Sequence, residues 1–455
     1  MHEPLYSADE MRAAEARYPG YPGTADELME RAAAAVAAEA LRAFPDAGRF
    51  AVVCGKGANG GDGRIAARLL REAGRDAEET NDLSGADVVV DALFGTGFQG
   101  PPRPDAAALI ERIETSGLQV LSVDLPSGVD ASTGETTGVS VNADVTVTFH
   151  GSKVGLAVAP GRFRAGRVVV ADIGLEPATT SIVRATPAVL ALVPRRGPRD
   201  SKFTAGSLLV VGGAPGTTGA AVLAATAALR ADAGYVTVAV PADELAVAEM
   251  LALEPVKRGF AYGSALETLE ADLARASALA VGPGLGRSDV ARDLVRGLLE
   301  RSTLPAVVDA DGLFALAPVA RDAATVLTPH TGELARLLDT DPAWVSAHRL
   351  EAAAGCADRF GAVVVLKGAD TIVRAPGGRT VVCDVGPPSL ATAGTGDVLT
   401  GVLGAFLAKG LDAIDAAVAA AIAHGLAARA VPNQAGLIAS DVVEALPSIL
   451  SCPSR

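Results

Sequence analysis

Apolar runs that end in loops of glycine and acidic residues recur along the chain, and this rhythm limits the fold more than any other feature. Runs at 50–54, 88–93 and 120–125 are separated by segments with helical spacing of apolar residues. Alternating strands and helices build a parallel sheet that helices cover on both faces. The loops that follow such strands meet at one edge of the sheet, where ligands bind. We therefore expect an α/β fold with its sites in these loops.

The length of 455 residues is too great for one ordinary core, so we expect two or three domains. The rhythm breaks between 176 and 201, where Pro187, Pro194 and Pro198 lie close together. It restarts at 207–213 with a strand that runs into a glycine turn. The sequence thus predicts one α/β domain over 1–190 and a second over 191–455.

Composition and charge exclude several classes of protein. Hydrophobic residues make up 49% of the chain, which suits large α/β cores. The net charge of −14 argues against nucleic-acid binding, because that needs clustered Lys and Arg. The four scattered cysteines form neither a zinc motif nor a disulfide pattern. With no secretory signal and no unbroken apolar span, we expect a cytoplasmic protein that binds no membrane.

The first candidate site follows the strand at 50–54. The three glycines of G-K-G-A-N-G fit the G-x-G-x-x-G pattern of a dinucleotide-binding turn, and Glu78 or Glu79 lies at the right distance to meet a ribose. Asn59 and Asp62 make this loop longer and more polar than that role requires. A turn that merely connects strand and helix is the alternative.

Two further strand ends in this half carry a carboxylate, Asp91 and Asp124. The oxygen atoms of Asn59, Asp91 and Ser127 could share a hard monovalent or divalent cation, which would leave Asp124 free for proton transfer. Capping of the two loops is the alternative role for both carboxylates.

These loops, A-N-G-G-D-G, D-A-L-F-G-T-G and D-L-P-S-G, resemble those of the YjeF N-terminal family, the NAD(P)H-hydrate epimerases, over about 11–175. The resemblance implies a Rossmann-like three-layer α/β/α sandwich, K⁺ near Asn59, Asp91 and Ser127, and acid–base catalysis at Asp124. Ala58 stands where the family usually has Asn. The residues implied to hold the hydrated nucleotide are Ala58, Asn59, Gly60, Gly61, Asp62, Gly95, Thr96, Gly97, Phe98, Gln99, Gly100 and Asp124.

The stretch A-T-A-G-T-G-D-V-L-T-G at 391–401 is the main candidate site of the second half. A helix that starts near Thr395 would point its unpaired N–H groups at an anion, and the glycines would let a phosphate approach. Asp397 would lie beside that anion, where an unpaired carboxylate is costly. This placement indicates a base that removes a hydroxyl proton, as in phosphoryl transfer to an alcohol. An ordinary capped helix start is the alternative.

Four more loops in this half follow apolar runs, at 282–286, 309–312, 327–333 and 366–371. Loops at the ends of neighbouring parallel strands converge on one crevice, so they would surround a single ligand together with Asp397. His330 is either a ligand contact or a capped turn residue. Lys367 is either a phosphate contact or a solvated strand end. His424, on an alanine-rich helix, is expected to be structural.

In this order the motifs resemble the YjeF C-terminal family, the ADP- or ATP-dependent NAD(P)H-hydrate dehydratases of the ribokinase-like α/β/α fold, over about 198–450. The resemblance implies that Asp397 is catalytic and that Mg²⁺ acts with ADP or ATP. V-G-P-P-S-L at 385–390 replaces the usual T-G-N-P-G-M. The implied contacts to the hydrate are Ala220, Ala221, Gly284, Gly286, His330 and Asp397. The implied contacts to the nucleotide are Lys367, Gly368, Ala369, Asp370, Thr371, Gly394, Thr395 and Gly396.

Together the two resemblances predict a fused enzyme of nicotinamide nucleotide repair. The first domain would equilibrate the R and S epimers of NAD(P)H hydrate, and the second would phosphorylate the S form and eliminate phosphate. Since the family is usually oligomeric, we also expect a homo-oligomer. The alternatives are a ribokinase-like small-molecule kinase with an appended nucleotide-binding module, a first domain that only binds, and a Rossmann dehydrogenase.

Overall fold

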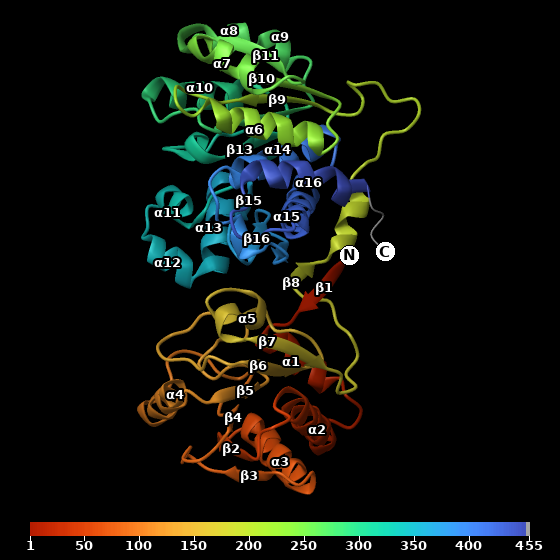
Figure 1. Cartoon of the computed structure of the whole chain (residues 1–455), viewed down its shortest axis with the longest axis vertical. Coiled ribbons are helices and arrows are strands. Elements are labelled where there is room, and N and C mark those ends of the chain that lie inside the picture. The colour runs from red at the N-terminus through yellow and green to blue at the C-terminus, as the bar shows by residue number, and fades with distance from the viewer. Residues whose placement is uncertain (452–455) are drawn as a thin grey trace. The chain divides into compact units, whose positions relative to one another are not determined.

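The computed structural model describes residues 1–451, which form two compact units (Figure 1). The N-terminal unit contains Pro4–Val183 and Ser346–His348, and the C-terminal unit contains Met1–Glu3, Arg184–Val345 and the chain from Arg349 onward. The division therefore lies before the expected boundary at 190. The first residues join the C-terminal unit because β1 (His2–Leu5) and β8 (Ile182–Ala185) lie side by side at one edge of its sheet.

The N-terminal unit is built on a six-stranded sheet in the order β3-β2-β4-β5-β6-β7, in which every neighbouring pair is parallel. Its strands are β2 (Arg49–Cys54), β3 (Asp76–Glu79), β4 (Val88–Ala92), β5 (Gln119–Val123), β6 (Val145–Phe149) and β7 (Arg167–Ala171). The sequence prediction missed β3, because D-A-E-E contains no apolar run.

Helices cover both faces of this sheet, as predicted. Its helices are α1 (Ala8–Ala16), α2 (Ala25–Ala43), α3 (Ala58–Glu72), α4 (Pro104–Ser116) and α5 (Val154–Ala157). Side chains of α2 and α3 share one core with Val52 and Val90, whereas Ile110 and Ile113 of α4 share another with Val53. Because alternate residues of a strand point to opposite faces, this division describes three α/β/α layers.

Helix α3 begins at Ala58, so the polar stretch 58–62, which the sequence analysis treated as a loop, forms its first turns. Glycines weaken a helix, but here close packing requires them. A Cβ atom on Gly60 would lie 1.9 Å from the carbonyl oxygen of Gly55, and one on Gly63 would lie 2.5 Å from the Cβ of Ala92. Tertiary packing thus overrides local propensity and brings these polar residues to the end of β2.

The C-terminal unit contains an eleven-stranded sheet in the order β1-β8-β17-β16-β15-β14-β13-β12-β9-β10-β11. In the part β15-β14-β13-β12-β9-β10-β11 every neighbouring pair is parallel, whereas β16 and β17 form an antiparallel extension. The remaining strands are β9 (Ser207–Val211), β10 (Tyr235–Pro241), β11 (Val256–Phe260), β12 (Ala278–Val281), β13 (Ala306–Val308), β14 (Thr325–Leu327), β15 (Val363–Leu366), β16 (Thr371–Arg374) and β17 (Thr380–Cys383).

Four helices near the C-terminus and after β9 pack on one another: α6 (Thr218–Arg230), α14 (Thr395–Ala408), α15 (Ala413–Ala430) and α16 (Ala439–Ser451). Helix α14 approaches α6 closely, because a Cβ atom on Gly401 would lie 2.0 Å from the carbonyl oxygen of Ala224. The other helices are α7 (Leu245–Leu251), α8 (Ala265–Thr268), α9 (Glu270–Leu273), α10 (Asp289–Arg301), α11 (Thr331–Leu338), α12 (Pro342–Ala347) and α13 (Arg349–Phe360).

Among residues 1–451, only α15 is long and apolar enough to be a candidate membrane span. Of that stretch, 67% is buried inside the protein, where α15 packs against α14 and α16. Core helices of this composition pass the same test of length and apolarity, so the feature is weak support for a membrane span.

Candidate active sites

Asp124 follows β5 and is a buried carboxylate with four contacts in the N-terminal unit. Its Oδ1 lies 2.9 Å from the Lys153 ammonium and accepts a hydrogen bond from Thr148 Oγ1 at 3.1 Å. Its Oδ2 accepts from the backbone N–H of Thr96 at 2.9 Å and from the Thr96 hydroxyl. Burial raises the pKa of Asp124, but the Lys153 charge and these hydrogen bonds outweigh it and hold the pKa below its usual range. Asp124 is therefore a stabilised anion.

Lys153, which the sequence analysis did not identify, is the counter-ion. Its side chain has no exposed surface, and its three ammonium donors reach Asp124, Thr148 Oγ1 at 2.8 Å and the Phe149 carbonyl oxygen at 2.8 Å. The available signal was a single lysine directly before the apolar run 154–159. A lysine at the start of a buried segment needs an acidic partner, and Asp124 is that partner.

Asp91 and Ser127, two of the three predicted cation ligands, are bonded to each other. The Ser127 hydroxyl donates to Asp91 Oδ1 at 2.6 Å, while the Ser127 N–H and the Ser122 hydroxyl each donate to Oδ2 at 2.9 Å. Asp91 is fully buried, and burial raises its pKa. All its hydrogen-bond donors within residues 1–451 are neutral, the fourth being the Leu93 N–H at 3.3 Å. A buried carboxylate with only neutral partners suits a bound cation.

Asn59, the third predicted cation ligand, meets Asp124 across Gly95. A Cβ atom on Gly95 would lie 2.9 Å from Asn59 Oδ1 and 3.0 Å from Asp124 Oδ2, so this position tolerates no side chain. The buried Nδ2 of Asn59 has no hydrogen-bond partner in the described part of the chain. The start of α3 and the loop 95–100 therefore converge on one site, with an amide donor left over for a ligand.

Asp62 and Glu15 add acidic groups to this site. Burial, followed by the charges of Asp124 and Glu15, raises the pKa of Asp62 to about 8. Glu15 comes from α1, and burial and Asp124 raise its pKa as well. Sequence reasoning could not place Glu15 here, because α1 reaches the site only through the fold.

The remaining predicted residues of the first site differ in accessibility. Ala58 is exposed as the first residue of α3, whereas Gly60 is buried. A Cβ atom on Gly61 would lie 2.7 Å from the sulfur of Met29, so Gly61 serves the packing of α3 on α2. In the loop, Phe98 stacks on Phe94, with 4.8 Å between ring centroids. Three loop residues are exposed: Gly97, Gln99 and Gly100.

The proposed ribose contacts of the dehydrogenase alternative are instead paired with arginines. On β3, Glu79 Oε1 lies 2.9 Å from Arg64 Nη2, and Glu78 Oε2 lies 3.7 Å from Arg49 Nη2. A ribose would have to displace these ion pairs, which disfavours that alternative.

In the C-terminal unit, α14 begins at Thr395, as predicted. Its N-cap Gly394 has a φ of 90° and no capping side chain, so the first N–H groups of the helix point outward without an intrahelical acceptor. The Thr395 hydroxyl donates to the Leu390 carbonyl oxygen at 2.8 Å and ties the preceding turn to the helix. This geometry is that of a backbone anion site.

Asp397 lies in the first turn of α14. Burial raises its pKa to about 7, and Asp309, Asp311 and Glu333 act in the same direction while Lys367 opposes them. Within residues 1–451, no hydrogen bond or ion pair reaches the Asp397 carboxylate. An unpaired carboxylate with a pKa near neutrality has the property required of a general base.

Lys367 lies beneath this first turn. Its Nζ is 2.9 Å from Asp309 Oδ1 and 3.8 Å from Glu333 Oε2, and a Cβ atom on Gly396 would lie 3.4 Å from it. Despite burial, these acidic neighbours raise the pKa of Lys367. Lys367, whose side chain is 22% exposed, is thus a half-buried charge at the anion site rather than a solvated strand end.

His330 is the N-cap of α11. Its Nδ1 accepts hydrogen bonds from the backbone N–H groups of Gly332 at 3.0 Å and Glu333 at 3.4 Å. The backbone N–H of His330 donates to Glu333 Oε2 at 2.8 Å. Burial lowers its pKa, so the ring is neutral and its proton is on Nε2. His330 therefore caps the turn, which is one of the two roles considered for it. Its Nε2 lies 3.5 Å from Glu333 Oε1 on a side chain that is 55% exposed, so a ligand can still reach it.

The predicted hydrate contacts on α6 and after β12 have different surroundings. Ala221 is fully buried, and a Cβ atom on Gly212 would lie 3.2 Å from its Cβ, so Ala221 supports the turn after β9. Ala220 faces Gly284, where an added Cβ atom would lie 3.1 Å away. The N–H of Gly286 donates to Asp311 Oδ2 at 3.0 Å.

The predicted nucleotide contacts after β15 form a tight turn. The Thr371 hydroxyl donates to the Gly368 carbonyl oxygen at 2.9 Å, and Gly368 and Ala369 are exposed. Asp370 points inward, where its Oδ2 lies 2.9 Å from Nε of the buried Arg349. Asp370 therefore holds the turn, and Arg349 is a partner that the sequence analysis missed.

His424 of α15 is 7% exposed and contacts the backbone of Thr395, behind the anion site. Burial lowers its pKa to about 4, and its Nε2 has no partner among the described residues. It is a neutral side chain that supports the start of α14.

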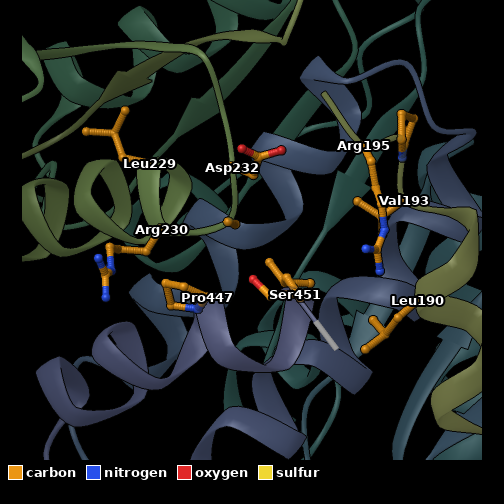
Figure 2. A pocket seen from close by; sticks show the side chains of 11 residues that line it. Leu190, Val193, Arg195, Leu229, Arg230, Asp232, Pro447 and Ser451 are labelled. Carbon is orange, nitrogen blue, oxygen red and sulfur yellow. The ribbon is translucent and has the colours of Figure 1, made fainter. Parts of the chain in front are cut away.

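A cavity of about 350 Å³ lies elsewhere in the C-terminal unit, at the C-terminal end of α6 (Figure 2). Leu190, Arg195, Arg230, Asp232, Pro447 and Ser451 are among the residues that line it. None of the predicted site residues does so. The candidate active site is the convergence of loops at α14 and not this cavity.

Comparison with known proteins matches both halves of the chain. The family described as NAD(P)H-hydrate dehydratase matches residues 208–449, and the family described as YjeF-related protein N-terminus matches residues 25–79 and 74–155. A bifunctional NAD(P)H-hydrate repair enzyme of Moorella thermoacetica is 38% identical over 88% of this chain and 87% of its own length. The Escherichia coli enzyme of the same description is 34% identical over 98% of this chain and 94% of its own length.

Among solved structures, the ADP/ATP-dependent NAD(P)H-hydrate dehydratase of Bacillus subtilis, co-crystallised with ATP and Mg²⁺, is 27% identical to this chain. It covers 58% of this chain and 96% of its own, with a TM-score of 0.53. A ribokinase-like superfamily protein of Enterococcus faecalis gives a TM-score of 0.53 at 20% identity and supports the fold alone.

Proposed function

Because this chain belongs to the family of bifunctional NAD(P)H-hydrate repair enzymes, we propose that each of its units catalyses one reaction on hydrated NADH or NADPH. The N-terminal unit interconverts the R and S epimers, and the C-terminal unit dehydrates the S epimer at the expense of ADP or ATP. The observation that carries this proposal is the pair of carboxylates, Asp124 and Asp397, each placed at the end of a parallel strand or at a helix start in its own unit.

In the dehydratase reaction, Asp397 accepts the proton of the ring hydroxyl as that oxygen attacks the terminal phosphorus of the nucleotide. The N–H groups at the start of α14 and the Lys367 charge stabilise the phosphate oxygens. Phosphate then leaves, and the neighbouring ring carbon loses a proton to restore the double bond. The relative from B. subtilis was crystallised with ATP and Mg²⁺, and Mg²⁺ would enter this site on the phosphate oxygens.

In the epimerase reaction, Asp124 remains ionised beside the substrate, and Asn59 Nδ2 offers an unused amide donor. We infer that K⁺ binds at Asn59, Asp91 and Ser127, since Asp91 is a buried carboxylate with neutral partners. The ion would supply the missing positive charge. Epimerisation measured in K⁺ and in N-methylglucamine buffers tests this inference. A rate that is the same in both buffers, for the protein freed of bound ions, would contradict it.

Product analysis tests the dehydratase proposal against the kinase alternative. The S hydrate and ATP should give reduced nicotinamide, measured by its absorbance, together with ADP and free phosphate. A kinase would instead release a stable phosphorylated hydrate, which phosphorus NMR would detect.

We also propose that the protein is a homo-oligomer that uses the β11 edge of the C-terminal sheet. Beside that edge, Met250 is 87% and Leu253 is 86% exposed, and Val247, Leu251 and Val256 are also exposed. An apolar patch next to a free sheet edge suits a second copy of the same chain. Light scattering should show an oligomer that Met250→Glu with Leu253→Glu dissociates. A monomeric wild-type protein would overturn the proposal.

A further inference from the structure

Four carboxylates and one lysine surround the start of α14. Asp309 follows β13, Asp311 lies two residues later, Glu333 is on α11, and Asp397 is on α14 itself. Lys367, after β15, is the lysine among them. In such a cluster the lysine would be expected to pair with the carboxylate whose pKa is most raised by burial and by its acidic neighbours, which is Asp397. If it paired with Asp397, the base of the proposed reaction would be lost.

The structure pairs the lysine differently. Lys367 Nζ lies 2.9 Å from Asp309 Oδ1, and within residues 1–451 no ion pair joins it to Asp397. Yet the two are close, since a Cβ atom on Gly396, the residue before Asp397, would lie 3.4 Å from Nζ. A small movement would therefore let Lys367 reach Asp397.

Asp309 is fixed in the position that prevents this movement. It is 1% exposed, and its second oxygen accepts a hydrogen bond from Thr400 Oγ1 at 2.6 Å. Thr400 lies three residues after Asp397 on α14, so one carboxylate contacts both the lysine and the helix that carries the base. Glu333, at 3.8 Å from Nζ, is a weaker second partner.

We propose that Asp309 is a positioning residue of the dehydratase site: it holds Lys367 as its counter-ion, so that Asp397 stays unpaired and able to accept a proton. This inference rests on the proposed dehydratase function. It adds a role for a residue that does not itself touch the reacting hydroxyl.

The charges around Asp397 give the direction of the expected change. The charged or titratable groups that act on it are Asp309, Asp311, Glu333 and Lys367, while His330 of α11 and His424 of α15 are neutral. Replacing Asp309 with Asn removes a like charge and also frees Lys367 to approach Asp397. Both effects lower the pKa of Asp397, so they weaken it as a base and keep it ionised to lower pH.

The test is the pH dependence of dehydration by the full-length Asp309→Asn variant, with the S hydrate and saturating ATP and Mg²⁺. We expect the acidic limb of kcat to move down by about one pH unit or more, and kcat at pH 8 to fall about tenfold. Asp311→Asn is the matched control, because it removes a like charge whose partner is Arg287 and not Lys367. The acidic limb of kcat in Asp311→Asn should move by less than about half a pH unit.

An unchanged limb in Asp309→Asn, or an equal shift in Asp311→Asn, would overturn the inference. If Asp309→Asn does not fold, as judged by lost ATP binding, Thr400→Val replaces it. That variant keeps the charge of Asp309 but loses the hydrogen bond that fixes it, so the limb should move the same way by a smaller amount, and an unmoved limb would overturn the inference. A wild-type protein that does not dehydrate the hydrate refutes the proposed function instead.

Discussion

Each unit has a catalytic candidate aspartate near a lysine, but the pKa of that aspartate is shifted in opposite directions in the two units. In the N-terminal unit, Lys153 contacts Asp124 directly at 2.9 Å, and the pKa of Asp124 is held below its usual range. In the C-terminal unit, Lys367 contacts Asp309 instead, and the pKa of Asp397 is raised to about 7. The same two residue types therefore give a stabilised anion in one site and a proton acceptor in the other.

The basicity of a shielded carboxylate therefore depends on which carboxylate the neighbouring lysine pairs with. Both lysines lie close to the carboxylate in question and both are largely shielded from water. The deciding feature is the ion pairing: Lys367 pairs with Asp309 and Glu333, whereas within the described residues Lys153 forms its ion pair with Asp124 itself.

The largest effect is expected from removing the base of the C-terminal unit. Asp397→Asn should lower the dehydration rate by about 10³-fold, within the range of general acid–base catalysis, and leave epimerisation unchanged. Asp412→Asn is the matched control, since Asp412 caps α15 away from the site. The rate is measured by the absorbance of reduced nicotinamide. Retention of more than a tenth of the activity would exclude Asp397 as the base.

The second largest effect is expected on the stability of the N-terminal unit when Lys153 is replaced. Lys153→Met leaves Asp124 buried and without a counter-ion, which should lower the free energy of unfolding of the N-terminal unit by about 3–5 kcal/mol. Urea unfolding at pH 7 measures it. The double variant Lys153→Met with Asp124→Asn removes both charges and should be clearly more stable than Lys153→Met alone. A double variant as unstable as the single one would show that packing, and not the ion pair, explains the loss.

The pH dependence of the two reactions should differ in one protein sample. Dehydration needs ionised Asp397, so its rate should fall about tenfold per pH unit below about pH 7 and level off above it. Asp124 stays ionised throughout this range because its pKa is lowered. Epimerisation should therefore lack the limb that Asp397 imposes. A dehydration rate that is constant from pH 8 to pH 5 would contradict the raised pKa of Asp397.

The smallest effect is expected at Ala58, the exposed first residue of α3. Ala58→Asn restores a side-chain amide beside the substrate, and one added hydrogen bond should lower the KM for the hydrate about three- to tenfold. Ala108→Asn, on the exposed surface of α4, is the control. If both variants keep the wild-type KM in the epimerase assay, position 58 does not contact the substrate.

The sequence predicted the strands well where apolar runs are long. The runs at 50–54, 88–93 and 120–125 each form a strand, with bounds that differ from the prediction by two residues or fewer. Strand β3 and the β16–β17 hairpin were missed, because edge and short strands depend on pairing with distant segments more than on local pattern. The cytoplasmic location stays a prediction.

Sequence motifs located the loops of the two sites, but not the charged partners that contact the carboxylates in these loops or shift their pKa values. Lys153, Glu15 and Arg349 come from segments without a recognisable motif, and only the fold brings them to Asp124, Asp62 and Asp370. Conversely, Ala221 lies within a predicted contact region but is buried under a turn. Single-residue accessibility and ion pairing follow from tertiary packing, which a local pattern does not encode.

The most direct test of the two-site account is the extent of conversion of an equal mixture of R and S hydrates with ATP and Mg²⁺. The wild-type protein should restore all of the reduced nicotinamide, because one unit supplies the S epimer that the other consumes. Asp124→Asn should stop near half, once non-enzymatic epimerisation is subtracted, and Asp397→Asn should restore almost none within the time that the wild-type reaction takes. A wild-type reaction that stops at half would contradict the account.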